Sequence, residues 1–163
     1  GNPFQMIDKQ WMLVTAGNRE HGYNTMTASW GCLGVLWNKP VAVCFIRPQR
    51  YTYTLTEKAE RLSLAFLGEA HRAALTYCGR NSGRDGDKFA AAGLHCVMTE
   101  GGVPYPAEAE LVLVCRKLYA DDLKKASFLD ASLLSNYAKD DFHRVYICEI
   151  EQALVRKSTQ DLL

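Results

Sequence analysis

The chain has 163 residues and nearly balanced charge, with 19 Lys and Arg against 18 Asp and Glu and a formal charge of +1. This length fits one domain, residues 1–163, with its own core. Binding to nucleic acid or to an anionic membrane normally requires a clear basic excess, so we expect neither partner. No segment resembles a signal peptide and no apolar run is long enough to cross a bilayer, so we expect a cytoplasmic protein.

The first third of the chain shows three strand patterns and then a helix start. Residues 11–16 are a short apolar run, and residues 41–46 are a continuous apolar run typical of a strand covered on both faces. Residues 24–30 alternate strictly, which predicts a strand with hydroxyl groups along one face. A helix is expected to begin near Tyr51, with Thr54 and Glu57 at the spacing of a capping box.

The rest of the chain adds three strands and two short helices. Residues 61–66 alternate as in a half-buried strand, and residues 111–119 and 145–154 predict two longer strands. Helical spacing in residues 70–77 is followed by Gly79 in the place of a cap, and residues 87–92 predict another helix before a glycine. Strands with short inserted helices indicate a β-barrel or an α+β fold rather than a doubly wound sheet.

One segment joins a buried strand to a helix and carries two arginines, Arg47 and Arg50, among hydroxyl side chains. A helix start offers unpaired backbone N–H groups and partial positive charge, both of which attract phosphate. Guanidinium groups bind phosphate oxygens two at a time. The segment is therefore a candidate phosphate site; the alternative is that the proline ends the strand and both arginines are solvated.

The segment from Gly79 to Lys88 combines three glycines, three cations and a serine, Ser82, between two helical patterns. Glycine allows backbone N–H groups to approach a ligand closely, and a lysine at a helix start can reach an anion. The spacing is not that of a phosphate-binding loop of nucleotide triphosphatases. A flexible polar connector is the alternative.

The strand over residues 24–30 is the third candidate, because Thr25, Thr27 and Ser29 share one face and Trp30 follows them. Small polar side chains suit the edge of a flat polar ring system, which Trp30 could shield. The alternative is a strand with one solvated face and Trp30 in the core.

The cysteines and histidines show no metal pattern. The six cysteines are scattered without CxxC or Cys/His spacing, and the four histidines lack ligand spacing. We therefore expect free, mostly buried thiols and no metal site. No motif of a catalytic nucleophile stands out either, so a cofactor is expected to perform the chemistry.

Together and in this order, these segments resemble the flavin-reductase-like FMN-binding proteins, particularly their flavoredoxin-type branch. The resemblance covers residues 11–154. The matching segments are Asn24-Thr25-Met26-Thr27-Ala28-Ser29-Trp30-Gly31, Leu36-Trp37-Asn38-Lys39-Pro40, Arg47-Pro48-Gln49-Arg50-Tyr51-Thr52, Tyr77-Cys78-Gly79-Arg80-Asn81-Ser82-Gly83-Arg84-Asp85, Asp87-Lys88, Ala109-Glu110-Leu111 and His143-Arg144-Val145-Tyr146-Ile147.

The resemblance implies a mostly β fold, a six-stranded Greek-key split β-barrel with short inserted helices that forms a homodimer, with non-covalent FMN near the subunit interface. It implies that residues 24–30 line the isoalloxazine ring, that Arg47, Arg50 and Thr52 hold the phosphate, and that Ser82 and Lys88 reach the ring edge or the ribityl-phosphate tail. Residues 121–141 often shape the substrate side in relatives. The implied cofactor-binding residues are Asn24, Met26, Thr27, Ala28, Ser29, Trp30, Arg47, Arg50, Tyr51, Thr52, Cys78, Gly79, Ser82 and Lys88.

Two functions follow from the resemblance, and a third departs from it. The first is an oxidoreductase that passes hydride or electrons through FMN, with NADH or NADPH as donor. The second is an FMN electron carrier that serves a redox partner protein without turnover of its own. The third is a split barrel that has lost FMN and binds another planar ligand, which the retained Arg47, Arg50 and Lys88 argue against.

Overall fold

The computed structural model describes residues 1–157, so the last six residues of the expected domain lie outside the described part. One antiparallel sheet of seven strands, in the order β2-β1-β5-β8-β9-β4-β3, dominates the fold, beside a two-stranded sheet of β6 and β7. The strands are β1 (Met12–Asn18), β2 (Gly22–Ala28), β3 (Gly31–Leu36), β4 (Lys39–Ile46), β5 (Arg61–Phe66), β6 (Cys96–Met98), β7 (Pro104–Pro106), β8 (Leu111–Asp122) and β9 (Arg144–Val155).

The helices are short and lie between the strands. The α-helices are α1 (Pro3–Gln5), α2 (Tyr51–Lys58), α3 (Arg72–Arg80) and α4 (Lys88–Ala91). A π-helical turn, Met6–Gln10, continues α1, and the 3₁₀ turns are Glu69–His71, Gly83–Asp85, Lys125–Ser127 and Ala131–Tyr137.

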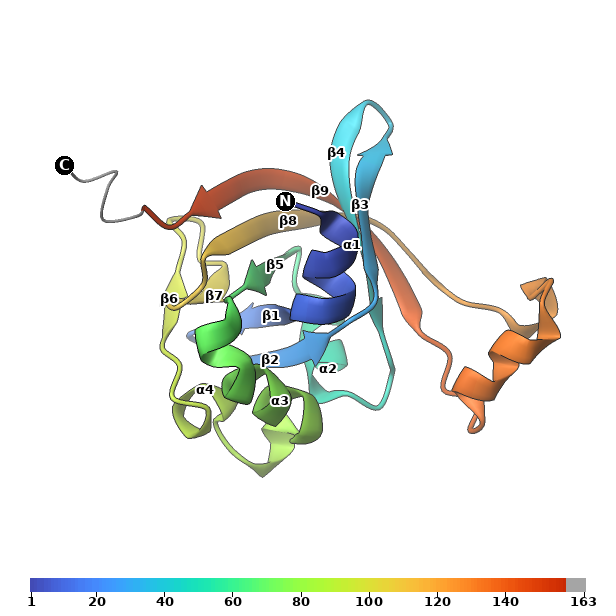
Figure 1. Ribbon diagram of the computed structural model, residues 1–163, viewed down its shortest axis with the longest axis horizontal. Helices are drawn as coiled ribbons and strands as arrows, with labels where there is room; N and C mark the ends of the chain where they lie inside the picture. Colours follow the sequence, from blue (N-terminus) through green and yellow to red (C-terminus); the bar gives the residue numbers. More distant parts are fainter. Residues whose placement is uncertain (158–163) are drawn as a thin grey trace.

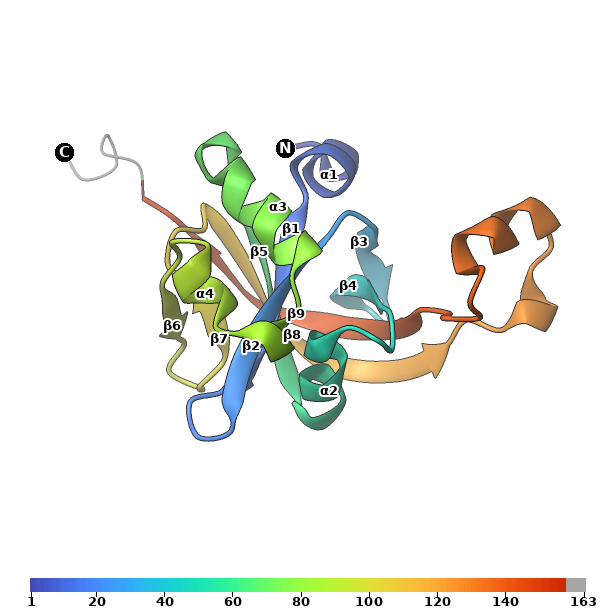
Figure 2. The same ribbon diagram turned by 90° about the horizontal axis from the view of Figure 1, so that it is seen from below.

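The large sheet curves around a core (Figures 1 and 2) but does not close, because its edge strands β2 and β3 do not pair with each other. The expectation of six strands is thus too low: the sheet contains β3 in addition. The sequence pattern missed β3 because most of its residues are exposed, so burial does not impose an alternation.

Two apolar clusters lie on opposite faces of the sheet. Met12, Leu62 and Leu64 belong to the cluster inside the curve. Leu13 and Ala65 belong to the second cluster, together with Leu75, Cys78 and Phe89 of the helices α3 and α4. The strand β5 is therefore buried on both faces, and the prediction that it is half-buried is wrong.

Two of the predicted caps are wrong, although the helices exist. Helix α2 begins after Arg50, and Thr54 lies within it, where its hydroxyl donates to the Tyr51 carbonyl oxygen at 2.7 Å. Gly79 lies within α3 instead of after it. A Cβ atom at Gly79 would stand 3.3 Å from Thr27 Cβ, so glycine here permits α3 to approach β2 closely.

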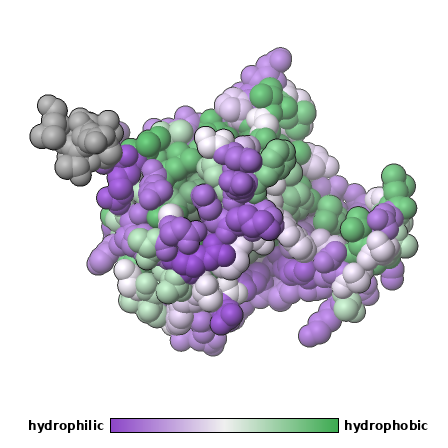
Figure 3. Space-filling model, in the orientation of Figure 1, coloured by the Kyte–Doolittle hydropathy of each residue, from purple (hydrophilic) through white to green (hydrophobic). Residues whose placement is uncertain are grey.

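Two segments project from the body of the molecule in Figure 1, and the second of them also projects in Figure 2. One is the hairpin of β3 and β4, and the other is residues 123–143, which we call the arm. Exposed apolar side chains gather on both (Figure 3). These residues are Val35, Leu36 and Trp37 on the hairpin and Leu129 and Leu133 on the arm.

All six cysteines are free, and four of them, Cys44, Cys78, Cys115 and Cys148, are buried, as the sequence predicts. Across residues 1–157 no His, Cys, Asp and Glu side chains gather in a group that could hold a metal ion. No helix in that same range has the length and apolar character needed to cross a membrane.

Candidate functional site

A cleft of about 230 Å³ opens where β2 and β4 end and β9 begins. Nine residues line it, seven of which the sequence analysis named as cofactor-binding. The lining residues are Met26, Thr27, Ala28, Ser29, Trp30, Phe45, Arg47, Arg50 and His143. The strand end at residues 26–30 and the arginine segment are far apart in sequence, and the fold brings them together here.

Arg50 lines the cleft. Its guanidinium donates to the backbone carbonyl oxygens of Gly79 and Cys78, at 3.1 and 3.2 Å, near the end of α3. Burial lowers the pKa of Arg50. No carboxylate in residues 1–157 forms an ion pair with Arg50, so its charge is balanced only by carbonyl dipoles.

Lys88 stands beside Arg50 and is only 3% exposed. Its Nζ donates to the carbonyl oxygens of Thr25 and Cys78, both at 2.9 Å. Burial and the neighbouring charge of Arg50 lower the pKa of Lys88 to about 8. Lys88 is not among the residues that line the cleft, and no acidic side chain of residues 1–157 forms an ion pair with it.

Two cations therefore converge on one carbonyl oxygen, that of Cys78, without a neutralising carboxylate. Like charges held together away from water are unfavourable unless an anion is close. A phosphate group at the open side of Arg50 would relieve this imbalance. The donor set thus fits the anionic end of a flavin nucleotide.

Arg47, three positions before Arg50, has the opposite surroundings. Its NH1 forms an ion pair with Asp141 Oδ2 at 2.7 Å, and its NH2 donates to the carbonyl oxygen of Asn136 at 3.0 Å. Its guanidinium also lies 5.0 Å from the centre of the Tyr137 ring. Arg47 lines the cleft, but the arm already neutralises its charge.

Several predicted residues lie behind the lining instead of on it. Thr52 is fully buried and accepts a hydrogen bond from Asn24 Nδ2 at 3.0 Å. Ser82 caps the turn Gly83–Asp85 by accepting from the Arg84 amide at 3.1 Å. Tyr51 lies under the Arg84 guanidinium, 5.2 Å from its ring centre. These residues hold the surrounding elements together.

The hydroxyl face of β2 is largely engaged within the protein. Thr25 is fully buried and its hydroxyl pairs with that of Thr15 at 2.9 Å. The Thr27 hydroxyl donates to the carbonyl oxygen of Leu75 in α3. The interpretation that these hydroxyls edge a ligand ring is therefore wrong for Thr25, while Thr27 and Ser29 reach the cleft.

Three aromatic side chains, Trp30, Phe45 and His143, form a wall of the cleft. Trp30 is 47% exposed, which excludes the alternative that it lies in the core. The His143 ring meets Trp30 and Phe45 edge-on, with ring centres 5.5 and 6.2 Å apart. Phe45 was not predicted as a lining residue, although Phe45 and Arg47 are two positions apart and therefore share one face of the strand and its continuation.

His143 is buried, and its Nδ1 lies 2.6 Å from the hydroxyl oxygen of Tyr137 in the arm. Burial and the charge of Arg47 lower the pKa of His143 to about 4, despite the opposing effect of Asp141. The ring is therefore neutral at neutral pH. The matching segment beginning at His143 was recognised in the sequence, but nothing local indicated that its side chain enters a cleft.

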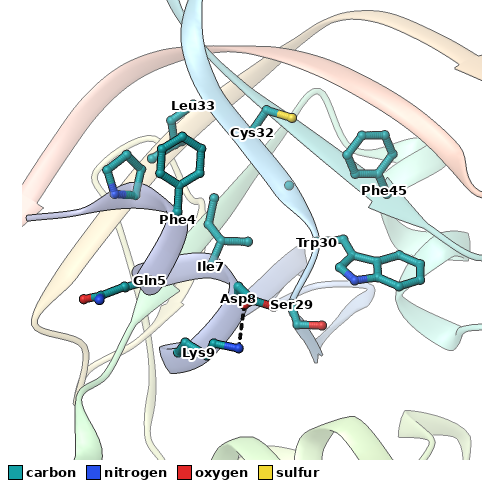
Figure 4. Close-up of a pocket in the computed structure, with 12 residues that line it drawn as sticks. Phe4, Gln5, Ile7, Asp8, Lys9, Ser29, Trp30, Cys32, Leu33 and Phe45 are labelled. Atoms are coloured by element: carbon teal, nitrogen blue, oxygen red, sulfur yellow. Dashed lines mark ion pairs between the residues drawn. The ribbon is translucent and has the colours of Figure 1, made fainter.

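A larger apolar cavity of about 610 Å³ adjoins the cleft and shares Ser29, Trp30 and Phe45 with it. Figure 4 shows Phe4 and Ile7 from the N-terminal turns facing this space, with the ion pair of Asp8 and Lys9 at its rim. This cavity was not predicted from the sequence, because its walls come from three separate segments, residues 3–9, residues 29–33 and Phe45. Its further lining residues are Pro3, Gln5, Gly31, Cys32 and Leu33.

The model of the family described as "Flavin reductase like domain" matches residues 5–163. Similar folds include the FMN-binding protein from Thermus thermophilus, at 21% identity and TM-score 0.70, covering 92% of this chain and 73% of that one. Flavoredoxin from Methanosarcina acetivorans is similar at 21% identity and TM-score 0.70, covering 93% and 72%. An NADH:FAD oxidoreductase from Streptomyces globisporus C-1027 is similar at 17% identity and TM-score 0.68, covering 90% and 74%. No curated protein matches the chain.

Proposed function

This chain belongs to the family of flavin reductase like domains, and we propose that it binds FMN without a covalent link and uses it for oxidation and reduction. The family resemblance inferred from the sequence is confirmed by the match over residues 5–163. The fold is the mostly β, split-barrel-like fold of that family.

The unneutralised pair of Arg50 and Lys88 carries the proposal. Both are held near the carbonyl oxygen of Cys78 with no carboxylate partner in the described chain. A bound phosphate would accept charge-assisted hydrogen bonds from Arg50 and be stabilised by the nearby charge of Lys88. One such cation pair suits one terminal phosphate, which favours FMN over FAD.

The aromatic wall suits the flat ring of the same ligand. Trp30, Phe45 and His143 line the same cleft as Arg50. Aromatic side chains pack against planar ring systems and exclude water from them. We therefore place the phosphate toward Arg50 and the isoalloxazine ring toward Trp30.

Bound FMN supplies hydride or electron transfer, and the protein supplies binding and orientation. The adjoining apolar cavity lies against the same Trp30 and Phe45 side chains, so it offers space for a second small molecule beside the ring. We propose that NADH or NADPH donates the electrons there. This arrangement favours an enzyme over a carrier that only serves a protein partner.

We also propose that two copies of the chain associate. The exposed apolar residues of the hairpin and the arm, Val35, Trp37 and Leu129 among them, project away from the body where a second copy could cover them. Exposed apolar patches of this kind commonly mark protein interfaces. Sedimentation equilibrium of the purified protein tests this, with a monomer as the contradicting result.

The function is tested with purified protein and added flavin. We expect a bound yellow flavin that chromatography after denaturation identifies as FMN, and oxidation of NADH or NADPH that depends on it. Bound FMN without donor oxidation, but with reduction by a protein partner, would establish the carrier function instead. Absence of flavin binding would disprove both.

A further inference from the structure

The side chain of His143 has one engaged nitrogen and one free nitrogen. Nδ1 is 2.6 Å from the Tyr137 hydroxyl, whereas Nε2 has no hydrogen-bond partner in residues 1–157. Three edge-on aromatic contacts, with Trp30, Phe45 and Tyr137, fix the plane of the ring. Because Tyr137 occupies Nδ1 and His143 lines the cleft, Nε2 is the polar atom that remains for a ligand.

The direction of the bond to Tyr137 follows from the hydrogen-bonding capacity of the two groups. A buried phenol requires an acceptor for its proton, and the described chain provides none for Tyr137 other than His143 Nδ1. If Nδ1 carried the proton, the phenol proton would be left without a partner, which is costly in a buried site. Tyr137 therefore donates and Nδ1 accepts.

The charges around the ring agree with a neutral imidazole. Arg47 and Asp141 are the charged groups that act on it, and they form an ion pair with each other at 2.7 Å. Burial lowers the pKa of His143 to about 4. A neutral ring that accepts at Nδ1 must carry its proton on Nε2.

We infer that Tyr137 is a positioning residue that holds His143 in its Nε2–H form, so that Nε2–H donates a hydrogen bond to a carbonyl oxygen of the molecule in the cleft. The inference rests on the proposed function for the identity of that molecule. The carbonyl belongs either to the isoalloxazine ring or to the carboxamide of a nicotinamide. Tyr137 thus acts on the ligand only through His143.

The first experiment reads the imidazole directly in flavin-free protein. Long-range ¹H–¹⁵N correlation spectra of the wild type should show His143 with an unprotonated, hydrogen-bonded Nδ1 and a protonated Nε2, assigned by comparison with His143→Gln. In Tyr137→Phe the Nδ1 resonance should move to the position of an unbonded nitrogen. A protonated Nδ1 in the wild type, or an unchanged Nδ1 resonance in Tyr137→Phe, would overturn the inference.

Tyr119→Phe is the matched control, since it also removes one phenol hydroxyl. That hydroxyl contacts Asp121 at 3.3 Å, and Tyr119 is 49% exposed on β8. The His143 resonances should not change in this variant. Circular dichroism of both variants separates a lost hydrogen bond from a lost fold.

The second experiment identifies the carbonyl by adding ligands in sequence. A shift of the Nε2 proton on addition of FMN assigns the flavin carbonyl, and a shift only when NAD⁺ is added to the FMN-loaded protein assigns the carboxamide. Tyr137→Phe should weaken binding of the responsible ligand about three- to tenfold. If FMN binds and neither addition moves Nε2, the donor role is wrong. If FMN does not bind, the proposed function fails while the first experiment still decides the role of Tyr137.

Discussion

Arg47 and Arg50 stand three positions apart, yet they lie in different electrostatic surroundings. The arm gives Arg47 a carboxylate at 2.7 Å and a backbone carbonyl oxygen at 3.0 Å. Arg50 meets only carbonyl oxygens and shares one of them with the buried Lys88. One arginine has its counter-charge within the protein, and the other does not.

The difference suggests that two arginines of one short segment have different roles, one in fixing the arm and one in binding a ligand. An arginine that is already paired gains little from a bound anion, because the new contact competes with the existing one. An unpaired, partly buried arginine gains more, because the anion removes an unfavourable state. We therefore propose that Arg47 holds the arm and that Arg50 holds the phosphate.

The largest expected effect comes from Arg50→Ala. Loss of a charge-assisted hydrogen bond should weaken FMN binding by about 1.5–3 kcal/mol, which is roughly 10- to 150-fold in Kd. Flavin fluorescence titration measures the change. Arg116→Ala is the matched control, because Arg116 is paired with Glu149 on the sheet, and it should leave FMN affinity unchanged. Equal effects of the two variants would mean that the phosphate site is misplaced.

The protonation of Lys88, which lies beside Arg50, provides a pH-dependent test of the unneutralised cation pair. Its pKa is lowered to about 8 by burial and by Arg50, so between pH 8 and its ordinary value of 10.5 the unfolded chain binds more protons than the native protein. Stability of the flavin-free protein should therefore rise with pH across this window, while FMN affinity should fall as Lys88 loses its charge. Urea unfolding and FMN titration at several pH values measure both. Lys88→Met should lack the rise in stability; the same rise in this variant would contradict the account.

Arg47→Ala and Asp141→Asn test the other half of the comparison. Each breaks the contact that fixes the arm, so amide hydrogen exchange over residues 131–142 should become faster. FMN affinity should change by less than about threefold, in the range of a weakened indirect contact. If Arg47→Ala lost as much FMN affinity as Arg50→Ala, Arg47 would have to be counted among the residues that bind the phosphate.

The last prediction concerns the protonation of His143 and the stability of the protein, not ligand binding. Its pKa of about 4 lies below its ordinary value of 6.5, because burial and Arg47 disfavour the charged ring. The unfolded chain therefore binds more protons between pH 4 and 6.5, and the native protein loses stability as pH falls through this window. Wild type and His143→Gln should thus differ in the pH dependence of their unfolding free energy. Parallel curves for the two proteins would contradict the lowered pKa.

Much of the fold could be predicted from the sequence, because burial imposes a periodicity. The runs at 41–46, 111–119 and 145–154 are strands, and the segment from residue 87 begins a helix capped by Asp87. The pattern failed where burial is absent or complete. The exposed β3 was not predicted, because burial imposes no pattern on it. The alternation in residues 61–66 predicted a half-buried strand, but a second apolar cluster covers the other face of β5.

The candidate site, like the fold, could be predicted from the sequence only in part. The two arginines could be identified from their residue type and place, since phosphate binds to cations near a helix start. Residues 26–30 could be identified from their alternation and from the resemblance to the family. Phe45, His143 and the apolar cavity could not, because their side chains meet only after separate strands and the arm are packed together. The hydroxyls of Thr25 and Thr27 were overvalued, since sequence does not show which internal acceptors a hydroxyl will find.

By itself the sequence determined the family, the mostly β architecture and the presence of cations at a strand–helix junction. Only the tertiary structure decided which cation lacks a counter-charge. The physical reason is distance: an ion pair forms over about 3 Å, and Asp141 reaches Arg47 from 94 positions away in the chain. No local pattern around residue 47 contains that information.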